Sequence, residues 1–102
     1  MRGNRTVKVD ANQGAIVQAL RTMGAAVKSI AIVGAGCPDL LVVFRGVTML
    51  LEVKQKGARL TMAEEEFMGT WPGIAFVVTS GGEACLKVAE AARPCACRGG
   101  GE

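Results

Sequence analysis

The chain of 102 residues carries 12 Lys and Arg against nine Asp and Glu, giving a formal net charge of +3. This length predicts one domain, and the mild positive charge permits nucleic-acid binding without requiring it. The sequence has no His and no Tyr, which excludes His-based metal sites, His general bases and tyrosine nucleophiles. No apolar run reaches the ~18 residues of a membrane span, and no signal-peptide core follows the N-terminus. We therefore expect a cytoplasmic protein without a membrane partner.

The four cysteines offer little chemistry by their spacing. No Cys-x-x-Cys pair exists, and Cys95 and Cys97 are too close for ordinary zinc-ligand spacing. Reduced, structurally incidental thiols are one interpretation. The other is a redox or metal role for Cys95 and Cys97, which would make this a small interaction protein that works through its thiol tail.

Residues 1–9 form a predicted basic arm, with extended structure at Thr6–Val9. A first helix follows, with Asp10 as its N-cap, Gln13 at the capping-box position and Gly24 as its C′ glycine. Its apolar stripe has helical spacing and consists of Ala15, Ile16, Ala19, Leu20 and Met23. The single domain is expected to span residues 10–93.

Three strands are predicted next. The β-branched run Val27–Val33 is the first, and Gly34-Ala35-Gly36 breaks it. The other two, Leu40–Phe44 and Val47–Val53, flank a turn at Arg45-Gly46.

After a polar loop at Gln55–Leu60, Thr61 and Glu64 form a capping-box pattern that opens a second helix. Pro72-Gly73 ends it, and its inward-facing residues are expected to be Ala63, Phe67, Thr70 and Trp71.

Ile74–Val78 predicts a short buried strand. Ser80 and Glu83 open a last helix, which Pro94 stops, and residues 94–102 form a predicted flexible tail. The stripe of this helix is Ala84, Cys85, Val88, Ala89 and Ala92. The order α-β-β-β-α-β-α predicts an α/β fold with a central mixed sheet covered by helices.

A turn centred on Arg45-Gly46 makes the numbers of cross-strand partners sum to 91, so Asp39 falls opposite Glu52. Directly opposed residues project to one face with Cβ atoms about 4.5–5.5 Å apart. Lys54 projects to the same face because it lies two residues after Glu52. A slip of one residue would destroy the arrangement.

These three side chains suit phosphodiester hydrolysis. Two carboxylates this close repel each other unless a cation lies between them, and hard oxygen ligands suit Mg²⁺, with the carbonyl of Val53 as a further ligand. Lys54 can position the attacking water or neutralise developing charge. Apolar side chains on the same face form the expected floor, namely Leu41, Val43 and Leu50. The alternative is that Glu52 and Lys54 belong to a solvated strand face and that Asp39 is a turn residue.

The segments Gly36-Cys37-Pro38-Asp39 and Leu51-Glu52-Val53-Lys54 resemble the motifs of the PD-(D/E)XK nuclease superfamily. The likeness is to its small VRR-NUC type, similar to Holliday-junction resolvases and phage nucleases, and covers roughly residues 10–80. It implies a restriction-endonuclease-like core, a metal-dependent DNA endonuclease that requires Mg²⁺ or Mn²⁺, and a homodimer. It also implies that Asp39 and Glu52 bind the metal and that Lys54 is the catalytic lysine.

The chain departs from the family on its helices. The first helix lacks the usual glutamate, and Gln13 is the substitute unless it serves as a cap; this favours a catalytically weak nucleic-acid-binding module as the second hypothesis. Glu64 stands where many relatives have glutamine, and the capping box is its expected role. Candidate DNA contacts, which set position without reading sequence, are Arg45, Lys56, Arg59, Arg2, Arg5 and Lys8. The absence of a base-reading motif favours recognition of branched or junction DNA by its shape.

Overall fold

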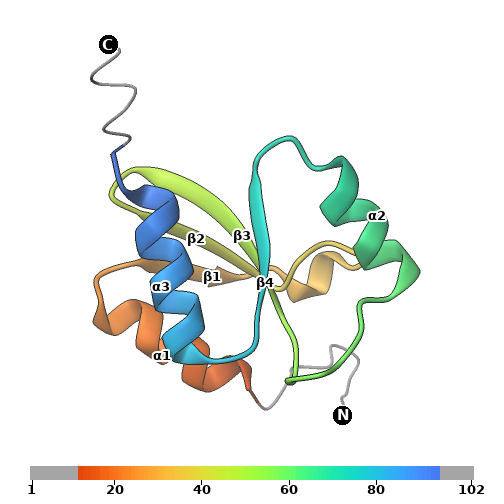
Figure 1. Ribbon diagram of the computed structural model, residues 1–102, viewed down its shortest axis with the longest axis horizontal. Helices are drawn as coiled ribbons and strands as arrows, with labels where there is room; N and C mark the ends of the chain where they lie inside the picture. Colours follow the sequence, from red (N-terminus) through yellow and green to blue (C-terminus); the bar gives the residue numbers. More distant parts are fainter. Residues whose placement is uncertain (1–11, 95–102) are drawn as a thin grey trace.

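The computed structural model describes residues 12–94 (Figure 1). The basic arm predicted at residues 1–9, the Asp10 cap, and the tail from Cys95 onward lie outside these described residues.

Within residues 12–94 the chain forms a small α/β domain with a four-stranded mixed sheet. The antiparallel strands β1 (Ala26–Ser29), β2 (Leu40–Phe44) and β3 (Val47–Val53) are neighbours, and β4 (Ile74–Val78) runs parallel to β3. The order of helices and strands is the predicted one, and β2, β3 and β4 have the predicted bounds.

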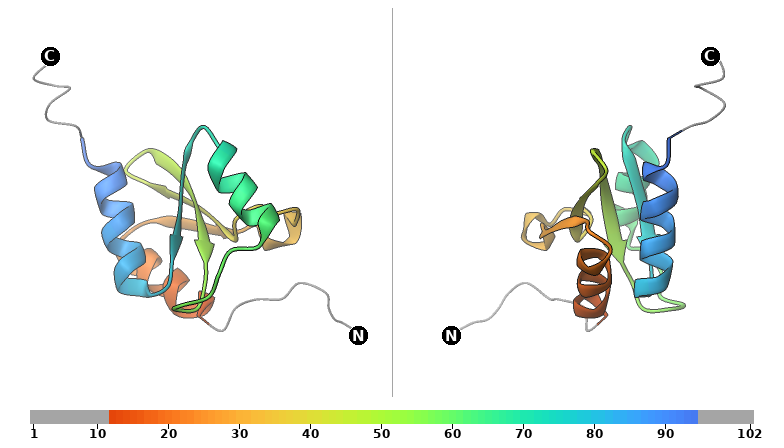
Figure 2. Two further views of the ribbon diagram at one scale, coloured as in Figure 1. Left: turned by 45° about the vertical axis from the view of Figure 1, so that its right-hand side comes forward. Right: turned by 90° about the vertical axis from the view of Figure 1, so that its left-hand side faces the viewer.

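The helices lie on both sides of this sheet. α1 (Gln13–Thr22) and α3 (Gly81–Ala92) cover one face, whereas α2 (Met62–Thr70) stands on the other side near the short 3-10 helix η1 (Ala31–Val33) (Figures 1 and 2). The two further views in Figure 2 keep this arrangement. The hydrophobic core therefore lies between the sheet and the α1–α3 layer.

The core is built from residues at regular spacing. Ile16 and Leu20 of α1, four residues apart, are fully buried, and so are Leu40 and Val42, which alternate along β2. β3 is buried continuously from Met49 to Val53, as expected for a central strand. The remaining core residues are Ala25, Val27, Val78, Ala84, Val88 and Ala92.

The C-terminus of α1 has the predicted glycine. Gly24 has a φ of +103°, its N–H donates to the Arg21 carbonyl, and the Ala25 N–H donates to the Leu20 carbonyl. These two hydrogen bonds make a Schellman motif, which satisfies carbonyls that the helix leaves free.

The N-terminus of α1 differs from the prediction. The N-cap is Asn12, and its side chain makes no cap hydrogen bond but donates to the carbonyls of Lys54 (3.1 Å) and Thr79 (2.6 Å). Gln13 is therefore the first helical residue and does not complete a capping box. The Asn12 side chain makes tertiary contacts in place of a helix cap. Its amide joins the start of α1 to the residues that follow β3 and β4.

The first predicted strand is too long. β1 ends at Ser29, and the chain then turns into η1. The reason is the length of its partner, because Ser29 pairs with Leu40, the first residue of β2. Beyond that point Val33 has no strand to pair with.

Burial along α2, β4 and α3 also corrects the prediction. No side chain of α2 is buried, and Ala63, Thr70 and Trp71 are exposed. β4 is an edge strand in which only Val78 is buried. The predicted stripes each include an alanine that is exposed, Ala15 in α1 and Ala89 in α3.

Candidate functional site

The β2–β3 hairpin has the predicted register. Phe44 pairs with Val47 and Leu40 with Leu51, so the numbers of each pair sum to 91. Arg45 and Gly46 both have positive φ, of 53° and 80°, as a type I′ turn requires. The mirror-image twist of this turn matches that of the strands, which fixes the pairing.

Asp39 lies just before β2, where this register brings it beside Glu52. Its N–H donates to the Leu51 carbonyl (3.1 Å), and its Oδ2 accepts from the Val53 N–H (2.8 Å). The carboxylate thus takes the place of a strand carbonyl and is held by residues on both sides of Glu52. These two hydrogen bonds hold Asp39 next to Glu52, near enough for its charge to act on the Glu52 carboxyl.

Glu52 is a buried acid, only 3% exposed. Burial, followed by the neighbouring charges of Asp39 and Glu64, raises its pKa to about 8, although Lys54 acts in the opposite direction. A neutral carboxyl at physiological pH is the expected response of an acid that lacks a sufficient positive partner. A divalent cation beside it would favour the ionised form.

Lys54 lies next to Glu52 but pairs more closely with a residue of α2. Its Nζ is 2.8 Å from Glu64 Oε1 and 3.9 Å from Glu52 Oε2. The hydrogen bond to Glu64 raises the pKa of Lys54, with burial opposing it. Burial would raise the pKa of Glu64, but the contacts with Lys54, the Thr61 N–H and Glu52 lower it. The ammonium is therefore held charged at the edge of the acidic pair.

Glu64 is the residue whose place in the site the sequence did not predict. Its predicted capping box is confirmed, because Thr61 Oγ1 accepts from the Glu64 N–H and Glu64 Oε1 accepts from the Thr61 N–H. The same Oε1 also reaches Lys54. No local pattern predicts this contact. The sequence indicated only that Glu64 caps the start of the second helix, which gave no sign of Lys54 as its partner.

Gln13 lies at the same end of the sheet. The preceding residue, Asn12, bonds the Lys54 carbonyl, and Gln13 is 6% exposed. Its Oε1 is buried and has no hydrogen-bond partner within residues 12–94. A buried oxygen without a donor costs about 1–3 kcal/mol, so this acceptor is available to a bound group.

The donor set fits a hard divalent cation with few protein ligands. No three His, Cys, Asp or Glu side chains in the part of the chain that the structure describes converge as a metal-binding group. The oxygens near one another come from Asp39 and Glu52, with Gln13 as a neutral candidate at the same end of the sheet. In a strand the N–H and C=O of one residue point the same way, so the Val53 carbonyl faces the Asp39 side. Two carboxylates and neutral oxygens suit Mg²⁺, which retains several waters.

The apolar floor is present in the expected strands. Leu50 is buried, whereas Leu41 and Val43 are half-buried. Leu50 pairs with Leu41 across the hairpin, and alternation places both on the Glu52 face.

The candidate DNA-binding cations that fall within residues 12–94 are not gathered in one place. Lys56 and Arg59 are exposed in the loop that follows Lys54 and leads to α2. Arg45 is exposed at the hairpin turn and lies over the Phe44 ring (5.7 Å). The whole length of β2, about 17 Å, separates Arg45 from Asp39, so Arg45 is not part of the carboxylate cluster.

Cys37 and Cys85 are free and half-buried. Burial and the charges of Glu52 and Asp39 raise the pKa of Cys37, so that it stays a protonated thiol. This agrees with the reduced, structural interpretation for Cys37. The alternative concerning Cys95 and Cys97 lies outside the described residues.

No helix within residues 12–94 has the length and hydrophobicity needed to cross a bilayer. The chain matches no protein-family model, no curated protein and no solved structure.

Proposed function

We propose that this protein is a metal-dependent DNA endonuclease with the core of the PD-(D/E)XK superfamily, of the VRR-NUC type. The observation that carries the proposal is the hairpin register, which sets Asp39 beside a buried Glu52 with Lys54 next to them. Acidic residues are seldom buried without a partner. Holding the Asp39 and Glu52 carboxylates close together at the end of a sheet costs free energy. A functional role for the two residues explains this cost better than a stabilising role does.

Each residue has a distinct part in the proposed reaction. Bound Mg²⁺ or Mn²⁺ would lower the pKa of a water and stabilise charge on the phosphoryl group. Asp39 offers a carboxylate whose orientation is fixed by the Val53 N–H, and Glu52 offers a second, once ionised. Lys54 holds an ammonium beside them, where it can orient the attacking water or neutralise charge that develops on the scissile phosphate.

A catalytically weak nucleic-acid-binding module of the same fold is the second candidate. Two observations favour it: the first helix presents the neutral Gln13, and the carboxyl of Glu52 has a pKa of about 8. Both reduce the negative charge available to a metal ion at physiological pH. Such a protein would bind DNA through its exposed cations and cut it slowly.

A cleavage assay separates the two candidates. Four-way junction, single-stranded and duplex DNA are incubated with the protein in Mg²⁺, Mn²⁺ or EDTA. We expect cutting only with metal, with junction DNA preferred, and a loss of about a hundredfold or more in Asp39→Asn and Lys54→Met. The asparagine retains an acceptor for the Val53 N–H, so the loss reports charge rather than misfolding.

Glu90→Gln, which neutralises an exposed carboxylate on α3, is the matched control and should cut as the wild type does. DNA binding without cutting by the wild type would favour the weak module. Absence of both binding and cutting would refute both candidates.

A further inference from the structure

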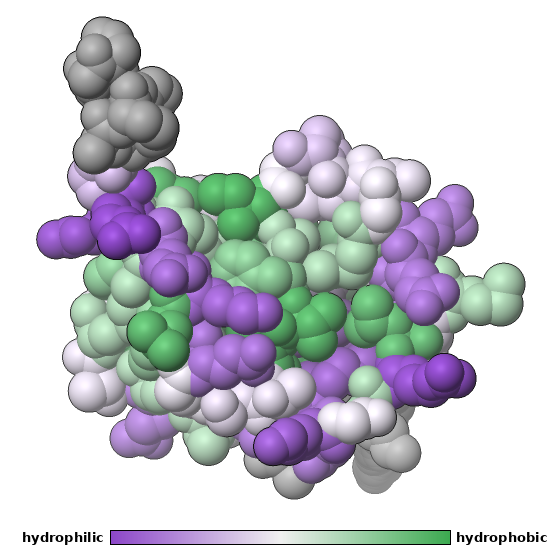
Figure 3. All heavy atoms as spheres, in the orientation of Figure 1, coloured by the Kyte–Doolittle hydropathy of each residue, from purple (hydrophilic) through white to green (hydrophobic). Residues whose placement is uncertain are grey.

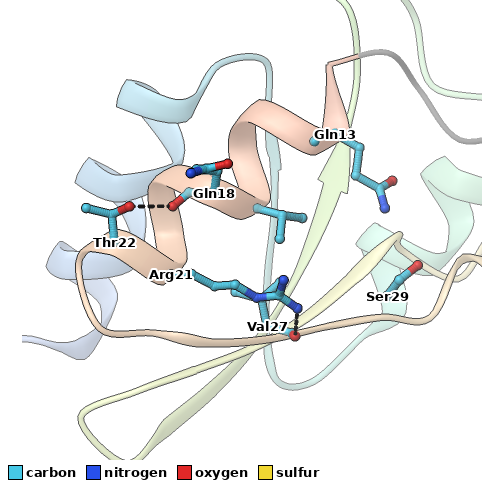
Figure 4. A pocket seen from close by; sticks show the side chains of 8 residues that line it. Gln13, Gln18, Arg21, Thr22, Val27 and Ser29 are labelled. Carbon is cyan, nitrogen blue, oxygen red and sulfur yellow. Dashed lines mark hydrogen bonds between the residues drawn. The ribbon is translucent and has the colours of Figure 1, made fainter.

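A groove adjoins the carboxylate cluster, and apart from Gln13, which lies where the two meet, its residues have no role in the proposed reaction. It has a volume of about 700 Å³ and lies between α1 and β1. Its lining includes Gln13, Gly14, Val17, Arg21, Val27 and Ser29 (Figure 4). Figure 4 shows the Gln13 carboxamide on the side of Ser29, with Arg21 extended across the groove to Val27. Since Asn12 bonds the Lys54 carbonyl, the groove begins next to the proposed active site.

We propose that this groove binds an unpaired nucleotide of the DNA strand that the enzyme cuts. The inference rests on the proposed function in taking the ligand to be a nucleic-acid strand. It adds a subsite that selects single-stranded or distorted DNA beside the cleavage point.

The charge of the groove agrees with this occupant. None of the described residues that line it is acidic, and Arg21 supplies a positive charge. One nitrogen of Arg21, Nη2, donates to the Val27 carbonyl (3.0 Å), which fixes the guanidinium at the sheet edge. A guanidinium has five N–H donors, so others remain for a phosphate of the strand.

The walls of the groove suit a base. Val17 and Val27 give apolar surface on opposite sides, since one belongs to α1 and the other to β1. Gly14 has no side chain, and nothing lies within 4 Å of the position where its Cβ would be. The first turn of α1 is therefore open on this side.

Gln13 gives the independent sign of a ligand. The side chain lines the groove, is more than nine-tenths buried, and has an Oε1 without a partner among the described residues. Rotation about its last side-chain bond is soft, so the carboxamide can turn and present either its acceptor or its donors to a base edge. A base that pairs with it would satisfy the polar atom that the free protein leaves unmatched.

Gly14→Leu tests the subsite without harming the fold. The leucine would project from the groove wall into open space, and leucine is a better helix former than glycine. Gly82→Leu is the matched control because Gly82 is also the second residue of a helix, α3, and has nothing within 4 Å.

Binding of short fluorescent DNA is measured by anisotropy in EDTA, so that no cutting contributes. We expect Gly14→Leu to weaken single-stranded binding about tenfold while duplex binding and Gly82→Leu stay unchanged. Arg21→Gln should make the negative slope of log K against log salt less steep by about one.

Equal single-strand affinity for Gly14→Leu and Gly82→Leu would overturn the subsite. The same result is expected if the groove instead binds an extended peptide along β1. Groove-dependent binding by a protein that fails to cut with metal would keep the subsite and refute the nuclease. Cutting with metal, together with no effect of Gly14→Leu on binding, would keep the nuclease and refute the subsite.

Discussion

Glu52 shows how one residue links the strand pattern to chemistry. The alternation of β3 puts it on the Asp39 face, and its position in the central strand buries it. Burial and neighbouring carboxylates then oppose its ionisation. The residue is stable in the fold only as a neutral acid or beside a positive charge.

The buried Glu52 should make the free energy of unfolding depend on pH in the absence of metal. The pKa of Glu52 is raised from 4.5 to about 8, so the folded state binds a proton that the unfolded chain releases. Its contribution to stability is complete below about pH 4.5 and is lost as the pH rises through 8. Denaturant unfolding in EDTA should show the free energy of unfolding falling by as much as about 1.4 kcal/mol per pH unit within this window.

Glu52→Gln keeps the size and removes the titration, so its stability should be nearly flat between pH 5 and 8. A wild type with the same flat profile would contradict the assigned pKa. Glu64, whose pKa is lowered, titrates below this window, and Lys54, whose pKa is raised, titrates above it.

α2 is the element whose position depends least on a hydrophobic core. It buries no side chain, and the stacked rings of Phe67 and Trp71 (centroids 5.0 Å apart) pack on each other along the helix. Its ties to the domain include the Glu64–Lys54 ion pair, the contact of Glu64 with Glu52 and the close approach of Gly36 to Ala63. The placement of Glu64 in the site therefore depends on the loop before β2.

Substitution of Gly36 tests this dependence. A Cβ at Gly36 would clash with the Ala63 carbonyl oxygen, and the φ of Gly36 is +82°. Gly57→Ala is the control, because Gly57 has a similar φ of +85° and nothing within 4 Å. We expect Gly57→Ala to cost about 1 kcal/mol of unfolding free energy and Gly36→Ala roughly 2–4 kcal/mol, from the added displacement of Ala63. An equal loss of unfolding free energy in Gly36→Ala and Gly57→Ala would show that the fold does not depend on the close approach of Gly36 to Ala63.

Apolar side chains are exposed where α2 and η1 lie near each other. Ile32 and Met62 are 80% and 86% exposed, and Val33 lies next to Ile32. In Figure 3 hydrophobic surface extends from the centre of this face to the right-hand side, where Figure 1 places η1 and α2. Burial of such surface is favourable by about 25 cal/mol per Å², so we propose this face as the interface of the homodimer that the resemblance implies.

Sedimentation velocity at micromolar concentration tests the dimer. We expect a dimer for the wild type and a monomer for the double variant Ile32→Asp, Met62→Asp, because two buried carboxylates would be unpaired at the interface. Leu86→Asp, a change at an exposed leucine of α3, should leave the dimer intact. A wild-type monomer would refute the dimer and leave the proposed site within one chain.

Local sequence patterns were enough to predict the hairpin, with the bounds of β2 and β3, the turn at Arg45-Gly46 and the position of Asp39 opposite Glu52. These follow from alternation and from local turn chemistry, which act between neighbours in the chain. The end of β1, the packing of α2 and the partner of Lys54 depend instead on contacts made in the folded protein. Such contacts join segments that are far apart in the sequence, as Asn12 with Lys54 and Gly36 with Ala63 do. No local period encodes them, because they depend on how complete elements fit together.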